Sequence, residues 1–96
     1  MTAEQAEVRD NPDESRYEIR LDGQLVGLAD YVLSAGIVTI PHTETSPEFG
    51  GRGLASKLVG FSLDDIRGRG LRVRPSCPFV AAYIAKNPEY QDLLAD

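Results

Sequence analysis

Residues 48–55 form a glycine-rich turn that runs directly into a stretch of helical periodicity. Gly50, Gly51 and Gly53 let the backbone approach a ligand without a Cβ in the way. The first amides of the following helix have no intrahelical partner, so an anion there would satisfy those donors and the helix dipole together. The segment predicts an anion cradle, although three glycines can also simply build a tight loop. The apolar side of the helix carries Leu54, Leu58, Phe61 and Ile66.

Two better-known phosphate loops are excluded by spacing. A Walker A loop needs a Gly-Lys-Ser/Thr triplet, and the chain contains none, so a nucleoside triphosphatase is not expected. The series Gly51, Gly53 and Ser56 comes close to the dinucleotide fingerprint, but 96 residues cannot hold two mononucleotide-binding halves. What remains is the pattern x-x-Gly-x-Gly at the start of a helix.

Length, charge and cysteine content limit the function further. A chain of 96 residues builds one small core, and no apolar run is as long as a membrane span. The residues near the N-terminus are acidic where a signal peptide is basic, so we expect a cytoplasmic protein without membrane contact. The single cysteine excludes an internal disulfide and an all-cysteine metal site, and no metal site is predicted.

The net charge of −5 argues against non-specific nucleic-acid binding, but the cations are concentrated in one segment. Residues 52–74 carry six Lys and Arg residues and two Asp residues. Arg52 and Lys57 stand where they could meet phosphates, whereas Arg67 and Arg69 fit a solvated helix face.

Three strands are expected after an acidic tail. Residues 1–14 contain little apolar side chain beyond Val8, and we expect them to be at least partly mobile, leaving a domain of residues 15–96. Residues 16–21 alternate, Asp22-Gly23 predicts a type I′ hairpin turn, and strands at 24–33 and 37–40 complete an antiparallel meander. Pro41 cannot donate to a sheet, so the third strand should bulge there and leave backbone groups for a ligand.

The second half alternates helix, strand and helix. A helix over residues 53–67 should end at Gly68 to Gly70, followed by a strand at 71–74 that must lie parallel to residues 37–40 if the helix is a crossover. Cys77 should cap a second helix that Pro78 begins and Asn87-Pro88 ends. The expected class is therefore mixed α/β of the α+β type.

Four segments together resemble a known family: residues 40–44 (IPHTE), 48–55 (EFGGRGLA), 75–80 (PSCPFV) and 83–90 (YIAKNPEY). They resemble the YjdJ-type subgroup of small, single-domain N-acetyltransferases of the GNAT superfamily, over residues 17–94. The resemblance implies a minimal GNAT fold that binds acetyl-coenzyme A (acetyl-CoA) between the third and fourth strands. Glu48 departs from the superfamily, where glutamine or arginine is usual, and its side chain should point away from the phosphates.

By the same resemblance the pantetheine arm follows the bulge at residues 42–45, and the pyrophosphate rests on residues 50–55. Asn87 could hydrogen-bond the cofactor, although capping of a helix explains it equally well. The predicted cofactor-binding residues are Thr43, Glu44, Phe49, Gly50, Gly51, Arg52, Gly53, Leu54, Ala55 and Asn87.

His42 and Cys77 are the predicted catalytic residues. His42, the one histidine, follows the strand break and has a pKa range that suits a general base; an exposed loop histidine is the alternative. Cys77 could be a nucleophile that forms an acetyl-enzyme, an acid that protonates coenzyme A, or a buried space-filler. A helix N-terminus alone cannot bring a thiol pKa below 7, so we expect Cys77 to lie within reach of His42, directly or through water. Tyr83 could protonate the cofactor sulfur, but core packing explains it better.

The leading hypothesis is transfer of an acetyl group from acetyl-CoA to an amine, which is a small amine, a protein lysine or a protein N-terminus. A non-catalytic module that binds acyl-CoA and an interaction domain without a cofactor are the alternatives.

Overall fold

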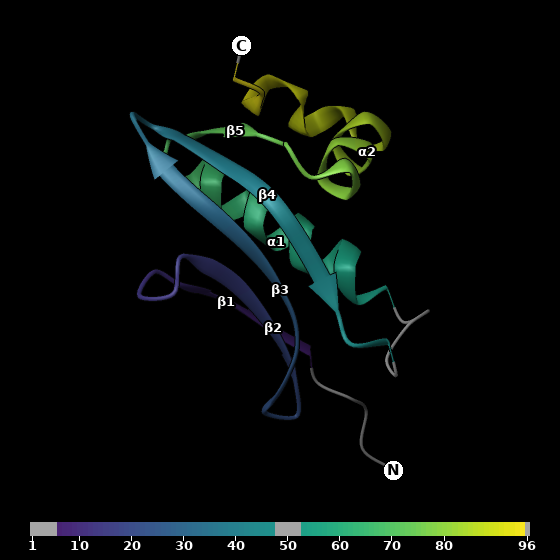
Figure 1. The fold of residues 1–96 in the computed structure, drawn as a ribbon. Helices are drawn as coiled ribbons and strands as arrows, with labels where there is room; N and C mark the ends of the chain where they lie inside the picture. The colour runs from purple at the N-terminus through teal and green to yellow at the C-terminus, as the bar shows by residue number, and fades with distance from the viewer. Residues whose placement is uncertain (1–5, 48–52, 96) are drawn as a thin grey trace.

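The computed structural model describes residues 6–47 and 53–95, which form one five-stranded sheet in the order β1-β2-β3-β4-β5 with two α-helices (Figure 1). The mixed α/β class is confirmed. No helix in these two ranges is long and apolar enough to cross a membrane. In chain order the elements are β1 (Ala6–Asn11), β2 (Arg16–Leu21), β3 (Gln24–Ser34), β4 (Ile37–Thr45), α1 (Leu54–Gly68), β5 (Arg72–Arg74), α2 (Pro78–Lys86) and the 3-10 helix η2 (Pro88–Leu93).

The antiparallel meander has four strands, not the three expected. β1 pairs with β2 from Ala6↔Leu21 to Asn11↔Arg16, so at least residues 6–11 of the expected mobile tail are a strand. Val8 is the one residue of β1 that belongs to the buried hydrophobic core. Residues 1–5 of the expected tail lie outside the described ranges.

Polar contacts explain why this strand forms without an apolar pattern. The Asp10 carboxylate accepts a hydrogen bond from the Tyr31 hydroxyl at 2.6 Å and pairs with Arg69 of α1 at 3.1 Å. Arg69 also pairs with Asp65 at 3.0 Å, which accepts from the Tyr17 hydroxyl at 2.7 Å. Tyr31 of β3 and Arg69, the C-cap residue of α1, therefore hold β1 in place.

The predicted hairpin turn is confirmed. Asp22 and Gly23 have φ values of 48° and 87°, as a type I′ turn requires. The turn between β3 and β4 repeats this geometry with Ala35 and Gly36.

The predicted bulge at Pro41 is also confirmed. Along β4 the pairing passes from Thr39↔Val32 to His42↔Asp30, so Ile40 and Pro41 together face one residue of β3. β5 runs parallel to β4, as expected, but pairs only from Ile37↔Arg72 to Thr39↔Arg74. The two strands therefore separate at the bulge.

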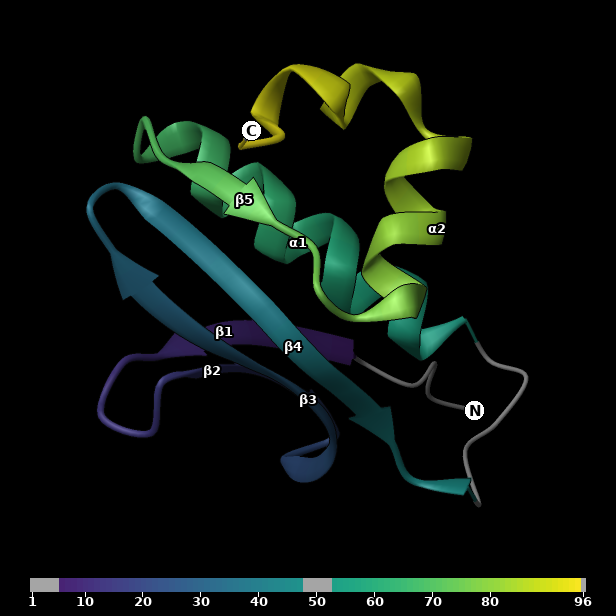
Figure 2. The ribbon, with the colours of Figure 1, turned by 45° about the horizontal axis from the view of Figure 1, so that its top comes forward.

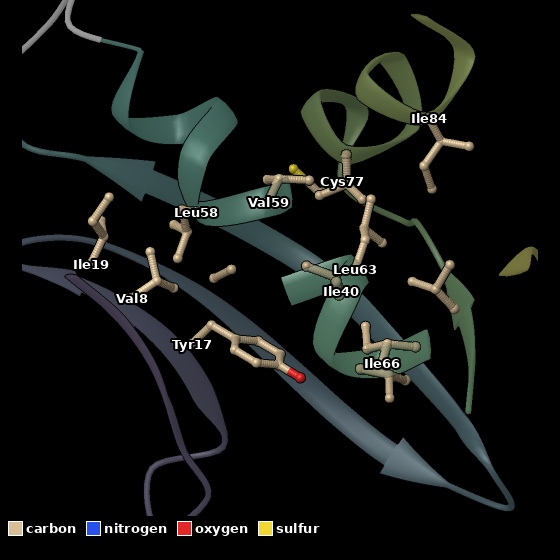
Figure 3. Close-up of a cluster of buried hydrophobic side chains, with 14 of the residues drawn as sticks. Val8, Tyr17, Ile19, Ile40, Leu58, Val59, Leu63, Ile66, Cys77 and Ile84 are labelled. Carbon is tan, nitrogen blue, oxygen red and sulfur yellow. The ribbon is translucent and has the colours of Figure 1, made fainter. Parts of the chain in front are cut away.

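One face of the sheet is covered by α1, which contacts all five strands, and α2 packs beside α1 at the β4–β5 end (Figure 2). α1 ends as expected: Gly70 has a φ of 69°, and the N–H groups of Gly70 and Leu71 donate to Arg67 O and Ile66 O, a Schellman motif. The core between these layers includes Ile19, Ile40, Leu58, Leu63, Ile66, Val73, Val80 and Ile84 (Figure 3).

Candidate active site

Cys77 lies where β4 and β5 separate. Its N–H donates to Ile40 O at 2.8 Å, which replaces the strand pairing that stops at Thr39. It is the N-cap residue of α2, with extended φ and ψ of −76° and 128°, and Pro78 follows at the first helical position, as predicted. The side chain is buried near Val59 of α1 (Figure 3).

The surroundings of Cys77 favour the thiolate. Burial raises the pKa of the thiol, but the Thr43 hydroxyl and the backbone N–H groups of Val80, Phe79 and Thr43 outweigh burial and lower the pKa below its usual value. Phe79 and Val80 occupy the second and third helical positions, whose amides point toward the N-cap residue, although the Cys77 side chain makes no capping hydrogen bond with them. Cys77 is therefore a buried member of the core cluster whose thiol pKa is nevertheless lowered.

Thr43 comes from the stretch of β4 beyond the bulge. Its partner on β3 is Ala29, a core residue, so the Thr43 side chain points toward the helices. Its Oγ1 atom is buried and makes no hydrogen bond of acceptable geometry, although the hydroxyl is close enough to Cys77 to influence the thiol.

His42 points to the opposite face of the sheet. Its partner on β3 is Asp30, and its ring is 53% exposed. The His42 ring Nε2 and Glu44 Oε1 are 2.6 Å apart, and this contact is the main reason why the pKa of His42 is raised. Partial desolvation lowers the pKa of His42, whereas the charges of Glu44, Asp30 and Cys77 raise it further. His42 is consequently protonated over a wider pH range than an isolated histidine.

The expected contact between Cys77 and His42 is not found. Cys77 belongs to the cluster on the helix side of the sheet, whereas the His42 ring lies on the other side with Glu44, so the interaction that the structure records between them is electrostatic. The same alternation separates Thr43 from Glu44, both of which were predicted to bind the cofactor.

Part of the predicted anion cradle can be placed. Gly53 has a φ of 70°, which favours glycine, and its carbonyl accepts the Lys57 N–H of the first turn of α1. That turn contains no acidic residue, and no side chain caps it, so nothing among the described residues there repels or replaces an anion. Leu54 is buried, and Ala55 follows it in the helix. The predicted residues Phe49, Gly50, Gly51 and Arg52, with Glu48, lie outside the described ranges.

The remaining candidates, Asn87 and Tyr83, make packing and capping contacts in the structure. Asn87 ends α2, where its side-chain amide donates to Tyr83 O at 2.8 Å, and it lies at the opposite end of that helix from Cys77. The Tyr83 ring packs beside Tyr90, and its hydroxyl lies against Gly60 of α1. Neither side chain is brought to the Cys77 sulfur.

Arg67 and Arg69, which were expected on a solvated helix face, both have ion-pair partners. Arg67 binds Asp92 and Arg69 binds Asp10 and Asp65, so both stabilise the fold. Lys57 is exposed on the first turn of α1.

The sequence did not predict the hollow that lies between the two α-helices. A hollow between α1 and α2 is lined by Ser56, Phe79, Ala82, Tyr83 and Lys86. These residues come from two helices, and local sequence patterns do not show how two helices pack against each other.

Known proteins resemble the chain in sequence and in fold. A family profile described as GCN5-related N-acetyl-transferase matches residues 16–93. Protein NATD1 of Mus musculus is 32% identical in an alignment of 76 residues that covers 76% of this chain and 68% of that protein. The solution structure of a GCN5-like protein from Staphylococcus aureus superposes with a TM-score of 0.71 at 25% identity, covering 93% of this chain and 87% of the other. An aminoglycoside N-acetyltransferase, AAC(6')-Iy, solved in complex with CoA, shares the fold at a TM-score of 0.51 and 17% identity, over 84% of this chain and 59% of its own.

Proposed function

Because the chain belongs to the GCN5-related N-acetyltransferase family, and is thus an acyltransferase, we propose that it transfers an acetyl group from acetyl-CoA to an amine. The observation that carries this proposal is the position of Cys77: a sulfur with a lowered pKa, at a helix N-terminus, where β4 and β5 separate. A thiol used only for packing would gain nothing from these donors.

The cofactor would lie along the helix side of this opening. We place its pyrophosphate on the amides that begin α1, where residues 49–55 were predicted to bind it and where Lys57 adds a positive charge. The hollow between the helices offers the aromatic rings of Phe79 and Tyr83, with Lys86 at its rim, to the rest of the nucleotide. The thioester would then reach the sulfur from the α1 side.

Cys77 is proposed as the nucleophile. Its thiolate attacks the thioester carbonyl carbon, the bond between that carbon and the coenzyme A sulfur breaks, and coenzyme A leaves as a thiolate that takes up a proton. The amine then attacks the acetyl group on Cys77, loses its proton, and releases the Cys77 thiolate. A lowered pKa favours this role, because it increases the share of the thiolate, which is the nucleophilic form.

The acceptor amine is proposed to approach from the other face of the sheet. His42 and Glu44 lie there, on the face away from Cys77, so the proton that the attacking amine loses would reach the imidazole through water in the opening between β4 and β5. No helix among the described residues covers this part of the face (Figure 2), so a protruding group such as a protein lysine or N-terminus can reach it. A small amine would fit the same chemistry.

Intact-mass spectrometry tests the nucleophile. After incubation with acetyl-CoA and no acceptor, the protein should gain one acetyl group that is absent in the Cys77→Ala variant. Calorimetry with acetyl-CoA, and a coenzyme A release assay over a panel of amines and peptides, complete the test. Undiminished turnover by Cys77→Ala would refute the covalent route, binding with neither adduct nor turnover would leave an acyl-CoA-binding module, and absence of binding would refute the proposed function.

A further inference from the structure

Thr43 carries a buried hydroxyl group without a satisfactory hydrogen-bond partner. Its Oγ1 is the one buried side-chain oxygen or nitrogen in residues 6–47 and 53–95 that lacks such a partner. Leaving a buried hydroxyl unpaired is unfavourable, so native proteins rarely do it without a functional reason. A state of the protein in which this hydroxyl gains an acceptor is therefore expected.

Cys77 is the neighbouring group that can become that acceptor. The hydrogen bond from Cys77 N–H to Ile40 O at 2.8 Å holds residue 77 against β4, three residues before Thr43, and the Thr43 side chain points to the same side of the sheet. A neutral thiol accepts hydrogen bonds weakly, whereas a thiolate accepts them strongly. The Thr43 hydroxyl therefore has a weak hydrogen-bond acceptor when Cys77 is a thiol and a strong one when Cys77 is a thiolate.

We propose that Thr43 favours the ionised form of Cys77 by donating its Oγ1–H to the charged sulfur, near the amides that begin α2. Thr43 is then a positioning residue that acts through Cys77. Its catalytic meaning rests on the proposed function, but the ionisation of Cys77 does not, because it can be measured without any cofactor.

The other groups around the sulfur do not replace this donor. His42 is the titratable group whose charge interacts with Cys77, and it lies on the far face of the sheet. The residues of α1 and α2 that share the core cluster with Cys77, Val59 and Val80 among them, are apolar. The Thr43 hydroxyl is the side-chain donor that influences the Cys77 thiol from the helix side.

The test is a pH titration of thiolate absorbance in the cofactor-free protein. Cys77 is the one cysteine, and all four tyrosines have raised pKa values, so their ionisation does not overlap with that of the thiol. Subtraction of the Cys77→Ala titration leaves the signal of Cys77 alone. Thr43→Val, which keeps the side-chain shape and removes the hydroxyl, should raise the midpoint by about one pH unit.

Thr43→Ser restores a hydroxyl and should keep the wild-type midpoint, while Thr39→Val removes a threonine hydroxyl on the opposite face of β4 and should also keep it. If Thr43→Val does not fold, Thr43→Ala is compared with Thr43→Ser in the same way. An unchanged midpoint without the hydroxyl, or the same shift in Thr43→Ser, overturns the proposal. A wild-type thiolate titration that responds to Thr43→Val as expected, in a protein that does not bind acetyl-CoA, would refute the proposed function and leave the role of Thr43 intact.

Discussion

At the scale of single residues, the site depends on strand alternation. His42 and Thr43 are neighbours in sequence, but one side chain faces solvent with Glu44 and the other faces the core beside Cys77. The sequence identified residues 42–45 as a functional stretch. It could not show that the stretch serves two faces, because the bulge at Pro41 shifts which residues point inward.

The His42–Glu44 contact predicts a measurable change in the pKa of the single histidine. Glu44→Gln should lower the His42 pKa toward its ordinary value, because the main cause of the increase is this hydrogen bond to a carboxylate. Chemical shifts of the imidazole followed against pH by NMR give the value directly. Asp13→Asn, in the exposed turn before β2, should not change it.

The sign of the effect on stability follows from the raised pKa. The His42–Glu44 interaction stabilises the folded state fully below the pKa of an unfolded histidine, and this contribution is lost as pH rises through the folded-state pKa. Activity that needs neutral His42 should increase over the same interval, and Glu44→Gln should move that increase to lower pH. A histidine that titrates identically in wild type and Glu44→Gln would contradict both expectations.

At the scale of elements, the spacing of α1 and α2 depends on Gly60. A Cβ built there would lie 2.8 Å from the Tyr83 hydroxyl oxygen, closer than real Cβ contacts allow. The helical pattern of α1 was readable from sequence, but nothing in it indicated that a second helix approaches at this residue.

Gly60→Ala should therefore destabilise the fold by about 1–3 kcal/mol, because the Tyr83 ring must shift out of its packed position. Chemical denaturation measures the change. Gly68→Ala is the matched control: a Cβ meets nothing within 4 Å there, so stability should hold or rise by up to about 1 kcal/mol.

Removing the obstructing hydroxyl provides a second check. The double variant Gly60→Ala with Tyr83→Phe should recover most of the lost stability, since the ring carbon Cζ of residue 83 is 3.7 Å from the added Cβ. Equal denaturation midpoints for Gly60→Ala and Gly68→Ala would show that the close helix contact is not a constraint.

At the scale of the whole molecule, the edge of the sheet is held by the network of Asp10, Asp65 and Arg69 described above. Arg69 joins carboxylates from β1 and α1, and each carboxylate accepts a tyrosine hydroxyl. The Asp10 side chain is only 10% exposed, so it depends on these partners. Arg69 follows Asp10 by 59 positions in the sequence, and for this reason the sequence did not show that residues 6–11 join the sheet.

Arg69→Met should destabilise the protein by roughly 1 kcal/mol, a modest loss because Arg69 itself is half exposed and its ion pairs are partly screened. Hydrogen exchange should accelerate first in β1, since Asp10 then keeps only its tyrosine partner. Arg9→Met breaks a fully exposed ion pair with Glu7 and should change stability by less than about 0.5 kcal/mol. Comparable losses in the two variants would argue against the network.

The sequence by itself determined the features that depend on local chemistry. These are the hairpin turn at Asp22-Gly23, the bulge at Pro41, the helix end at Gly70 and the N-cap position of Cys77. These depend on φ preferences, missing donors and periodicity, which act over a few residues. Only the tertiary structure decided that β1 joins the sheet, that Thr43 and not His42 accompanies Cys77, and that α2 closes on α1. Such contacts join residues far apart in the chain, so their energies become visible only when the elements are packed together.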